Sequence, residues 1–215
     1  MKVRDQCRRH RKRRTLSWYK AVRMNKAIAT TLMLVWSAGL QAESWVLDNE
    51  SSHLSFVTVK AGDLAEAHRF RRLSGEVSID GAAAIVIDLA SVDTLIPIRD
   101  ERMREHLFRT IQFPQATVSL QFDPEQITSI AEGSSGTLSL DGELTMMNYR
   151  IPVRTDALVV RLTPTEVLVV SRKPVVVHAA SLRMVEGIEK LREIARLPSI
   201  SKAVTVNFAL SFVLR

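Results

Sequence analysis

Cysteine is almost absent from this sequence of 215 residues, in which Cys7 is the only one. Cys7 lies in an N-terminal segment that we interpret as a leader, so the rest of the chain has neither a disulfide nor a thiolate metal ligand. The remaining 173 residues are still enough to bury an apolar core. The sequence therefore predicts a domain that folds without covalent cross-links.

Catalytic and metal-binding signatures are also missing. The chain has no glycine-rich phosphate loop, and Ser91 and Asp93 are not set in a Gly-x-Ser-x-Gly nucleophile pattern. The histidines outside the first 42 residues show neither His-x-His nor His-x-x-x-His spacing, which leaves them without a metal-ligand motif. The four histidines concerned are His53, His68, His106 and His178. We therefore predict no catalytic residue and no metal site.

No hydrophobic run is long enough to span a bilayer. Residues 27–40 form an apolar run of 14 residues, short of the ~20 that a transmembrane helix needs. A basic Met24-Asn25-Lys26 precedes it and small Ala42 follows it, a pattern typical of a signal peptide. We expect cleavage after Ala42 and export to the periplasm, with translation starting at Met24 and residues 1–23 a mis-annotated extension. An uncleaved anchor is the alternative.

The positive charge of the chain is confined to its leader. The formal net charge is +7, but residues 1–42 hold 11 of the 30 Lys and Arg and only one acid, Asp5. The other 19 basic and 22 acidic side chains give residues 43–215 a net charge of −3. A mildly acidic domain has no general attraction for phosphate backbones, so we expect no nucleic-acid partner. Only the basic stretch at 9–14 would suit a nucleic-acid or localisation tail.

Alternation of apolar and polar residues is the strongest positive signal after residue 43. This period of two places successive side chains on opposite faces of a strand. Many short strands of this kind favour an all-β fold, either a closed barrel or a sandwich of two sheets. Strands are predicted at 85–89, 118–122, 137–144 and 203–214, and less clearly at 54–59, 75–80, 153–162, 167–170 and 175–178.

Turns and two helices interrupt the predicted strands. Asp80-Gly81 and the segment 132–136 contain glycine where a hairpin needs a positive φ. Residues 99–108 predict a short charged helix, and 182–197 an amphipathic one that ends at Pro198. The amphipathic helix could close one end of a barrel or pack on its outside.

Four motifs occur in a fixed order along the chain. They are Trp45-Val46-Leu47-Asp48 with Ser52 and Phe56, Phe70-Arg71-Arg72-Leu73-Ser74-Gly75, Ala90-Ser91-Val92-Asp93-Thr94 with Ile98-Arg99-Asp100-Glu101-Arg102-Met103, and Phe113-Pro114-Gln115-Ala116-Thr117. The third is the most specific, because Ser-Val-Asp-Thr at a strand end leads into the Arg-Asp that opens the short helix. In this order the motifs resemble the YceI-like family of exported polyisoprenoid-binding proteins, and the resemblance extends from about Trp45 to the C-terminus.

This resemblance implies that residues 43–215 form a single domain, an eight-stranded antiparallel lipocalin-like barrel with one or two short helices. The barrel would hold a long isoprenoid chain, such as a quinone or a polyprenyl phosphate, in an apolar tunnel. Alternation itself does not distinguish a hollow barrel from a filled one. The ligand-binding candidates are the inward-facing Phe56, Val77, Ile87, Val118, Leu120, Phe122, Leu138, Leu140, Val206, Phe208 and Leu210.

Arg99 and Asp100 are the candidates for contact with a ligand head group. They stand together at the start of the short helix, where a guanidinium and a helix N-terminus could hold a phosphate or a quinone oxygen. A structural salt bridge or a helix cap is the alternative for both residues.

The leading functional hypothesis is a periplasmic binding or carrier protein for an amphiphilic lipid of the isoprenoid type, without a cofactor. The alternative is a non-catalytic accessory module of a membrane electron-transfer or stress-response system, with a membrane-protein partner and no mobile cargo. An enzyme acting on an isoprenoid ranks last. An edge strand near the C-terminus would let two chains pair as a homodimer.

Overall fold

The computed structural model describes residues 43–215, so the predicted leader and its cleavage site after Ala42 lie outside the described residues. Strands dominate this part of the chain. They are β1 (Ser44–Lys60), β2 (Leu64–Phe70), β3 (Leu73–Ser78), β4 (Ala82–Asp88), β5 (Val92–Asp93), β6 (Gln115–Gln121), β7 (Ser135–Met146), β8 (Tyr149–Thr163), β9 (Glu166–Ser171), β10 (Val175–His178) and β11 (Ala203–Leu214).

Short helical segments connect some of these strands. Of these, α3 reproduces the amphipathic helix expected from the sequence, and α1 with the π-helical η2 reproduces the charged one. The segments are η1 (Leu89–Ser91), α1 (Pro97–Arg102), η2 (Met103–Phe108), α2 (Glu125–Thr128), η3 (Ala179–Leu182) and α3 (Val185–Ile194). No helix within residues 43–215 combines the length and apolar composition needed to cross a bilayer.

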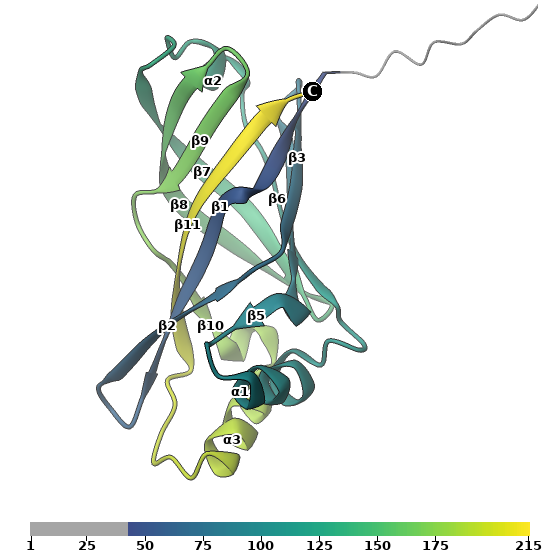
Figure 1. Ribbon diagram of the computed structural model, residues 1–215, viewed down its shortest axis with the longest axis vertical. Helices are drawn as coiled ribbons and strands as arrows, with labels where there is room; N and C mark the ends of the chain where they lie inside the picture. Colours follow the sequence, from purple (N-terminus) through teal and green to yellow (C-terminus); the bar gives the residue numbers. More distant parts are fainter. Residues whose placement is uncertain (1–42) are drawn as a thin grey trace, which may run out of the picture. The chain divides into compact units, whose positions relative to one another are not determined.

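Eight strands close into an antiparallel barrel (Figure 1). Hydrogen bonding runs in the order β1, β3, β4, β6, β7, β8, β9 and β11, and β11 then pairs with β1 to complete the circuit. The eight-stranded antiparallel barrel expected from the resemblance is confirmed, and the sandwich is excluded. Closure satisfies the backbone groups that an open sheet would leave at its edges.

The long strands β1 and β11 each have two successive partners along one side. Residues 44–46 of β1 pair with β3, and residues 54–60 pair with β2. Likewise, residues 209–213 of β11 pair with β9 and residues 203–206 with β10. Because β11 is also bonded to β1, our expectation that this strand forms a sheet edge is wrong, and with it the proposed route to a homodimer.

Helices α1 and α3 lie at one end of the barrel, beside β2, β5 and β10 (Figure 1). There α3 packs against η2, with Gly187 so close to the backbone of η2 that an added Cβ would lie 2.6 Å from the carbonyl oxygen of His106. We call this the helix end of the barrel. At the opposite end lie α2 and the hairpin between β8 and β9.

Candidate functional site

The barrel is hollow. Its interior contains a cavity of about 640 Å³, whose lining is mostly aliphatic and aromatic. This volume falls within the ~300–1,000 Å³ range of small-molecule sites in proteins. All eleven residues predicted to face the interior line this cavity, although their contact with a ligand stays a prediction. They are Phe56, Val77, Ile87, Val118, Leu120, Phe122, Leu138, Leu140, Val206, Phe208 and Leu210.

The helices close over the cavity rather than pad the outside of the sheet. Ile188 and Leu191 of α3 contribute to the lining, as do Met103 and Leu107 of η2. Of the two positions that the sequence left open for the amphipathic helix, the structure therefore shows the one across the barrel end. The apolar stripe of α3 faces the cavity and completes its wall.

Strand β2 introduces polar side chains at the inner face of the helix end, and sequence analysis missed it. In the ladder with β1, Glu66 is opposite Thr58 and His68 is opposite Phe56. Thr58, Phe56 and His68 all line the cavity. Because the inward positions of β2 include a glutamate and a histidine, the segment lacks the apolar alternation that reveals the other strands.

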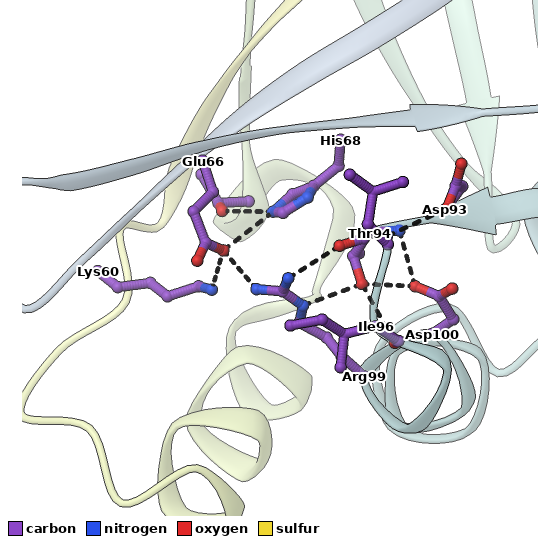
Figure 2. A network of polar contacts seen from close by, with 10 residues as sticks. Lys60, Glu66, His68, Asp93, Thr94, Ile96, Arg99 and Asp100 are labelled. Carbon is purple, nitrogen blue, oxygen red and sulfur yellow. Dashed lines mark hydrogen bonds and ion pairs between the residues drawn. The ribbon is translucent and has the colours of Figure 1, made fainter.

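An ion-pair network links β1, β2 and α1 at this end (Figure 2). The carboxylate of Glu66 accepts hydrogen bonds from both Lys60 and Arg99. The hydrogen bond from Lys60 is the main cause that lowers the pKa of Glu66 below its usual value. Lys60 and Arg99 both line the cavity, so one carboxylate serves two cations at its boundary.

The two head-group candidates occupy different positions in this network. Arg99 lines the cavity. It also donates hydrogen bonds from Nε to Thr94 Oγ1 and from Nη2 to the Thr94 carbonyl oxygen, each with a length of 2.9 Å. Asp100 Oδ1 accepts hydrogen bonds from the backbone N of Thr94 at 2.8 Å and from its Oγ1 at 2.6 Å. Both side chains therefore hold the start of α1 against β5 (Figure 2).

His68 is buried next to this network, with 5 % of its surface exposed. Its Nε2 lies 3.0 Å from Thr58 Oγ1 and 3.7 Å from the nearer carboxylate oxygen of Glu66. Its Nδ1 is buried and makes no hydrogen bond with any residue in 43–215. Burial, followed by the charge of Arg99, lowers the pKa of His68, so the imidazole is neutral near pH 7.

A row of aromatic rings begins at His68. The ring of Phe56 lies 5.3 Å, centroid to centroid, from both His68 and Phe70, and Phe70 lies 5.7 Å from Phe108. All four rings line the cavity. The helix end therefore combines an aromatic wall with one buried imidazole.

Residues 90–94, which include β5, hold the segment between β2 and β3 in place. The buried carboxylate of Asp93 accepts hydrogen bonds from Arg69 Nε at 3.0 Å and from Leu95 N at 3.1 Å, and it pairs with Arg71 Nε at 2.9 Å. The hydrogen bond from Arg71 is the main cause that holds the pKa of Asp93 far below its usual range. Ser91 Oγ donates to the Asp88 carbonyl oxygen. These polar residues fix the segment that leads into α1, the helix that carries Arg99.

Metal ligands do not converge in this part of the protein. Within residues 43–215, no group of three or more His, Cys, Asp or Glu side chains is placed to hold an ion. The chemistry available at the cavity is therefore apolar contact along the barrel, with hydrogen bonding and charge at the helix end.

A family model described as the YceI-like domain matches residues 45–212, which is most of the chain and nearly all of the barrel. The chain belongs to the YceI-like family. Among curated proteins, none matches it. The resemblance seen in the sequence is thus confirmed over residues 45–212.

Solved structures agree with the family. The YceI-like barrel described here is similar to a polyisoprenoid-binding domain from Saccharophagus degradans implicated in plant cell wall breakdown, with 36 % identity and a TM-score of 0.77. That match covers 81 % of this chain and 99 % of the other. BcnA of Burkholderia cenocepacia shares the fold, with 19 % identity, a TM-score of 0.60 and coverage of 77 % and 98 %. The chain therefore shares its fold with a domain described as polyisoprenoid-binding.

Proposed function

We propose that this YceI-like protein is a periplasmic carrier that binds the chain of an isoprenoid-type lipid inside its barrel. The cavity of about 640 Å³ is the observation on which the proposal rests, because a filled barrel of the same family would have nowhere to place a ligand. The likeness to a polyisoprenoid-binding domain, at 36 % identity, supports an isoprenoid as the ligand class.

The physical chemistry of the lining suits such a ligand. Removal of apolar surface from water contributes ~25 cal/mol for each Å² buried, so a long hydrocarbon gains affinity from its whole length without any specific contact. An eight-stranded barrel is wide enough for one slim chain and too narrow for a folded polypeptide segment. Binding in this site requires no catalytic group, and we propose a binding protein rather than an enzyme.

Export is part of the same proposal and rests on the predicted signal peptide. A carrier of apolar lipids is useful in the aqueous space between two membranes, where free isoprenoids have almost no solubility. The leader is strongly basic, whereas the domain that remains after the predicted cleavage has a net charge of −3.

Native mass spectrometry of the protein expressed with its own leader and purified from the periplasmic fraction tests this function. A mass of residues 43–215 plus one polyprenyl or quinone species, identified after organic extraction, is the expected result. A ligand-free protein that also fails to take up added isoprenoids would overturn it and favour the accessory module without cargo. Recovery only in the cytoplasm would overturn the periplasmic role.

A further inference from the structure

Four consecutive apolar residues between β5 and the first turn of α1 are exposed to water. Leu95 is 82 % exposed, Ile96 45 % and Ile98 51 %. Pro97 between them is exposed as well, whereas Thr94 immediately before the run is buried. An unbroken run of exposed apolar residues is unfavourable in water, and in folded proteins it usually marks a surface that contacts something else.

The backbone of Leu95 makes the presence of a leucine there still less expected. Its φ is +61°, in the left-handed region that leucine rarely adopts and that asparagine adopts more readily. The conformation is held by two hydrogen bonds, from Leu95 N to Asp93 Oδ1 at 3.1 Å and from Thr94 N to Asp100 Oδ1 at 2.8 Å. Folding alone therefore does not explain why this position carries a large apolar side chain.

Strand β2 brings a fifth exposed apolar side chain to the same region. Leu64 is 60 % exposed and shares a face of β2 with Glu66, two residues further along the strand. The ion pair between Glu66 and Arg99 joins that face to α1, directly after Ile98 (Figure 2). We call Leu64 and residues 95–98 the apolar rim. Because Arg99 lines the cavity, the apolar rim borders the cavity at the helix end.

The helix end is basic, although residues 43–215 as a whole are acidic. The segments that form it, 60–72, 89–114 and 178–202, contain 13 basic and 9 acidic side chains, a net charge of +4. The rest of the domain contains 6 basic and 13 acidic side chains, a net charge of −7. The apolar rim therefore lies at the positive end of a molecule whose charge is strongly asymmetric, which would orient that end toward an anionic surface.

We propose that the apolar rim docks this protein on a lipid bilayer with anionic head groups. The aliphatic side chains of residues 95–98 insert among the lipids, and the basic side chains of the helix end face the head groups. Apolar residues next to a basic surface are the combination that binds at a membrane interface.

The apolar rim suits a bilayer better than a protein partner. A stable protein–protein interface uses about 20–30 residues a side and is enriched in aromatic side chains. The rim, by contrast, consists of five residues, none of them aromatic. This inference goes beyond the proposed function, because it names the surface at which the barrel meets a membrane, and docking itself does not require a lipid in the cavity.

Vesicle sedimentation tests the apolar rim with the exported protein. The probes are vesicles of phosphatidylcholine alone and vesicles of equal parts phosphatidylcholine and phosphatidylglycerol. Leu95→Asn removes the most exposed side chain of the rim, and because asparagine tolerates the left-handed backbone, its unfolding in urea should need at least as much denaturant as that of the wild type. Leu162→Asn is the matched control, at an exposed leucine of β8 near the opposite end of the barrel.

The wild type should bind the anionic vesicles, with an affinity that falls as salt is added, and should bind phosphatidylcholine more weakly. Leu95→Asn should lose roughly tenfold in affinity for the anionic vesicles, the scale expected when one leucine side chain no longer leaves water. Leu162→Asn should bind like the wild type. Any part of the leader that remained would be common to all three proteins, so their differences report on the rim.

A fluorescent label gives a second readout that does not depend on an affinity. Cys7 is the only cysteine of the chain, so in a Cys7→Ser background the variant Leu95→Cys takes a single polarity-sensitive label. Its emission should shift to shorter wavelength with the anionic vesicles. The same label at Leu162→Cys should not respond.

Equal vesicle affinity of Leu95→Asn and the wild type, with an unshifted label at position 95, overturns the apolar rim as the docking surface. A wild type that binds neither kind of vesicle overturns membrane docking; if it is then a dimer in solution and Leu95→Asn a monomer, the rim is a contact between two copies of this chain. Uptake of geranylgeraniol from cyclodextrin, without vesicles, tests the proposed function separately. It should be equal in both proteins, and its failure in both contradicts the carrier but not the docking.

Discussion

Phe56 of β1 and His68 of β2 are direct cross-strand partners, and their ring centroids lie 5.3 Å apart inside the barrel. This pair marks the point where the apolar wall of the cavity meets its polar end. On one side of it the lining is mainly apolar; on the other, Lys60, Glu66 and Arg99 form the ion-pair network. An amphiphile can therefore satisfy both of its parts in one cavity.

A larger side chain that fills part of the cavity should block lipid binding. Val118 is half-buried and lines the cavity, whereas its neighbour Ser119 is exposed. Val118→Phe should lower isoprenoid affinity by about tenfold or more and change the free energy of unfolding by under ~1 kcal/mol, because the new ring fills open space. Ser119→Phe adds the same ring to the outer face and should bind normally. Comparable affinity in both variants would show that the lipid does not use this part of the barrel.

Removal of the Glu66 carboxylate should change the charge preference of the helix end. Glu66→Gln leaves Lys60 and Arg99 without their shared anion, and we expect affinity for geranylgeranyl phosphate to rise about tenfold, equivalent to ~1.4 kcal/mol. Hydrocarbon binding should not change. Glu101→Gln, at an exposed position of α1, is the control with the same loss of charge. Titration calorimetry measures both, and an equal gain in the two variants would point to general electrostatics instead.

Close packing of α3 on η2 should be sensitive to a single methyl group. A Cβ at Gly187 would lie 2.6 Å from the carbonyl oxygen of His106 and 3.0 Å from the Cα of Leu107, and neither backbone atom can easily move. Gly187→Ala should therefore lower the free energy of unfolding by about 1–3 kcal/mol, despite the better helix propensity of alanine.

The same change should speed lipid exchange, because α3 closes the cavity. At Gly136 the corresponding clash is with the end of the flexible Ile130 side chain, at 2.9 Å, so Gly136→Ala should be milder. Stopped-flow displacement of a fluorescent lipid measures the rates. A Gly187→Ala protein that unfolds and exchanges lipid like the wild type would contradict the close contact.

Asp93 should make stability depend on pH. Its pKa is lowered in the folded protein, chiefly by the hydrogen bond from Arg71, so its contribution is complete above the unfolded pKa of ~3.9 and is lost as pH falls toward the lower folded value. Asp93→Asn should lower the free energy of unfolding by about 2 kcal/mol near neutral pH. In urea titrations the gap from wild type should shrink below about pH 4.

Asp141→Asn is the matched control for this titration. Asp141 pairs with Arg154 on the barrel surface, where both side chains are largely exposed, and such pairs contribute only ~0–1 kcal/mol. The free energy of unfolding of Asp141→Asn should stay close to that of the wild type at every pH. A gap for Asp93→Asn that persists unchanged in acid would assign the effect to packing rather than to the carboxylate charge.

The sequence by itself determined the barrel strands and the apolar lining. Side chains of a strand alternate between its faces, so residues such as Val118, Leu138 and Phe208 could be assigned to the interior from period two alone. All eleven assigned positions line the cavity. The amphipathic stripe of 182–197 likewise predicted a helix, observed as α3, because its period of 3.6 is equally local.

Tertiary structure alone decided that the barrel is hollow, that α3 closes its end, and that β11 is no edge. Each depends on contacts between residues far apart in the chain, as in the pairing of Trp45 with Leu214 that closes the sheet. Strand β2 escaped detection because Glu66 and His68 face inward, against the usual rule for buried positions. Their partners Lys60, Arg99 and Thr58 come from other elements, so no local pattern indicates that His68 can be buried and Glu66 partly buried there.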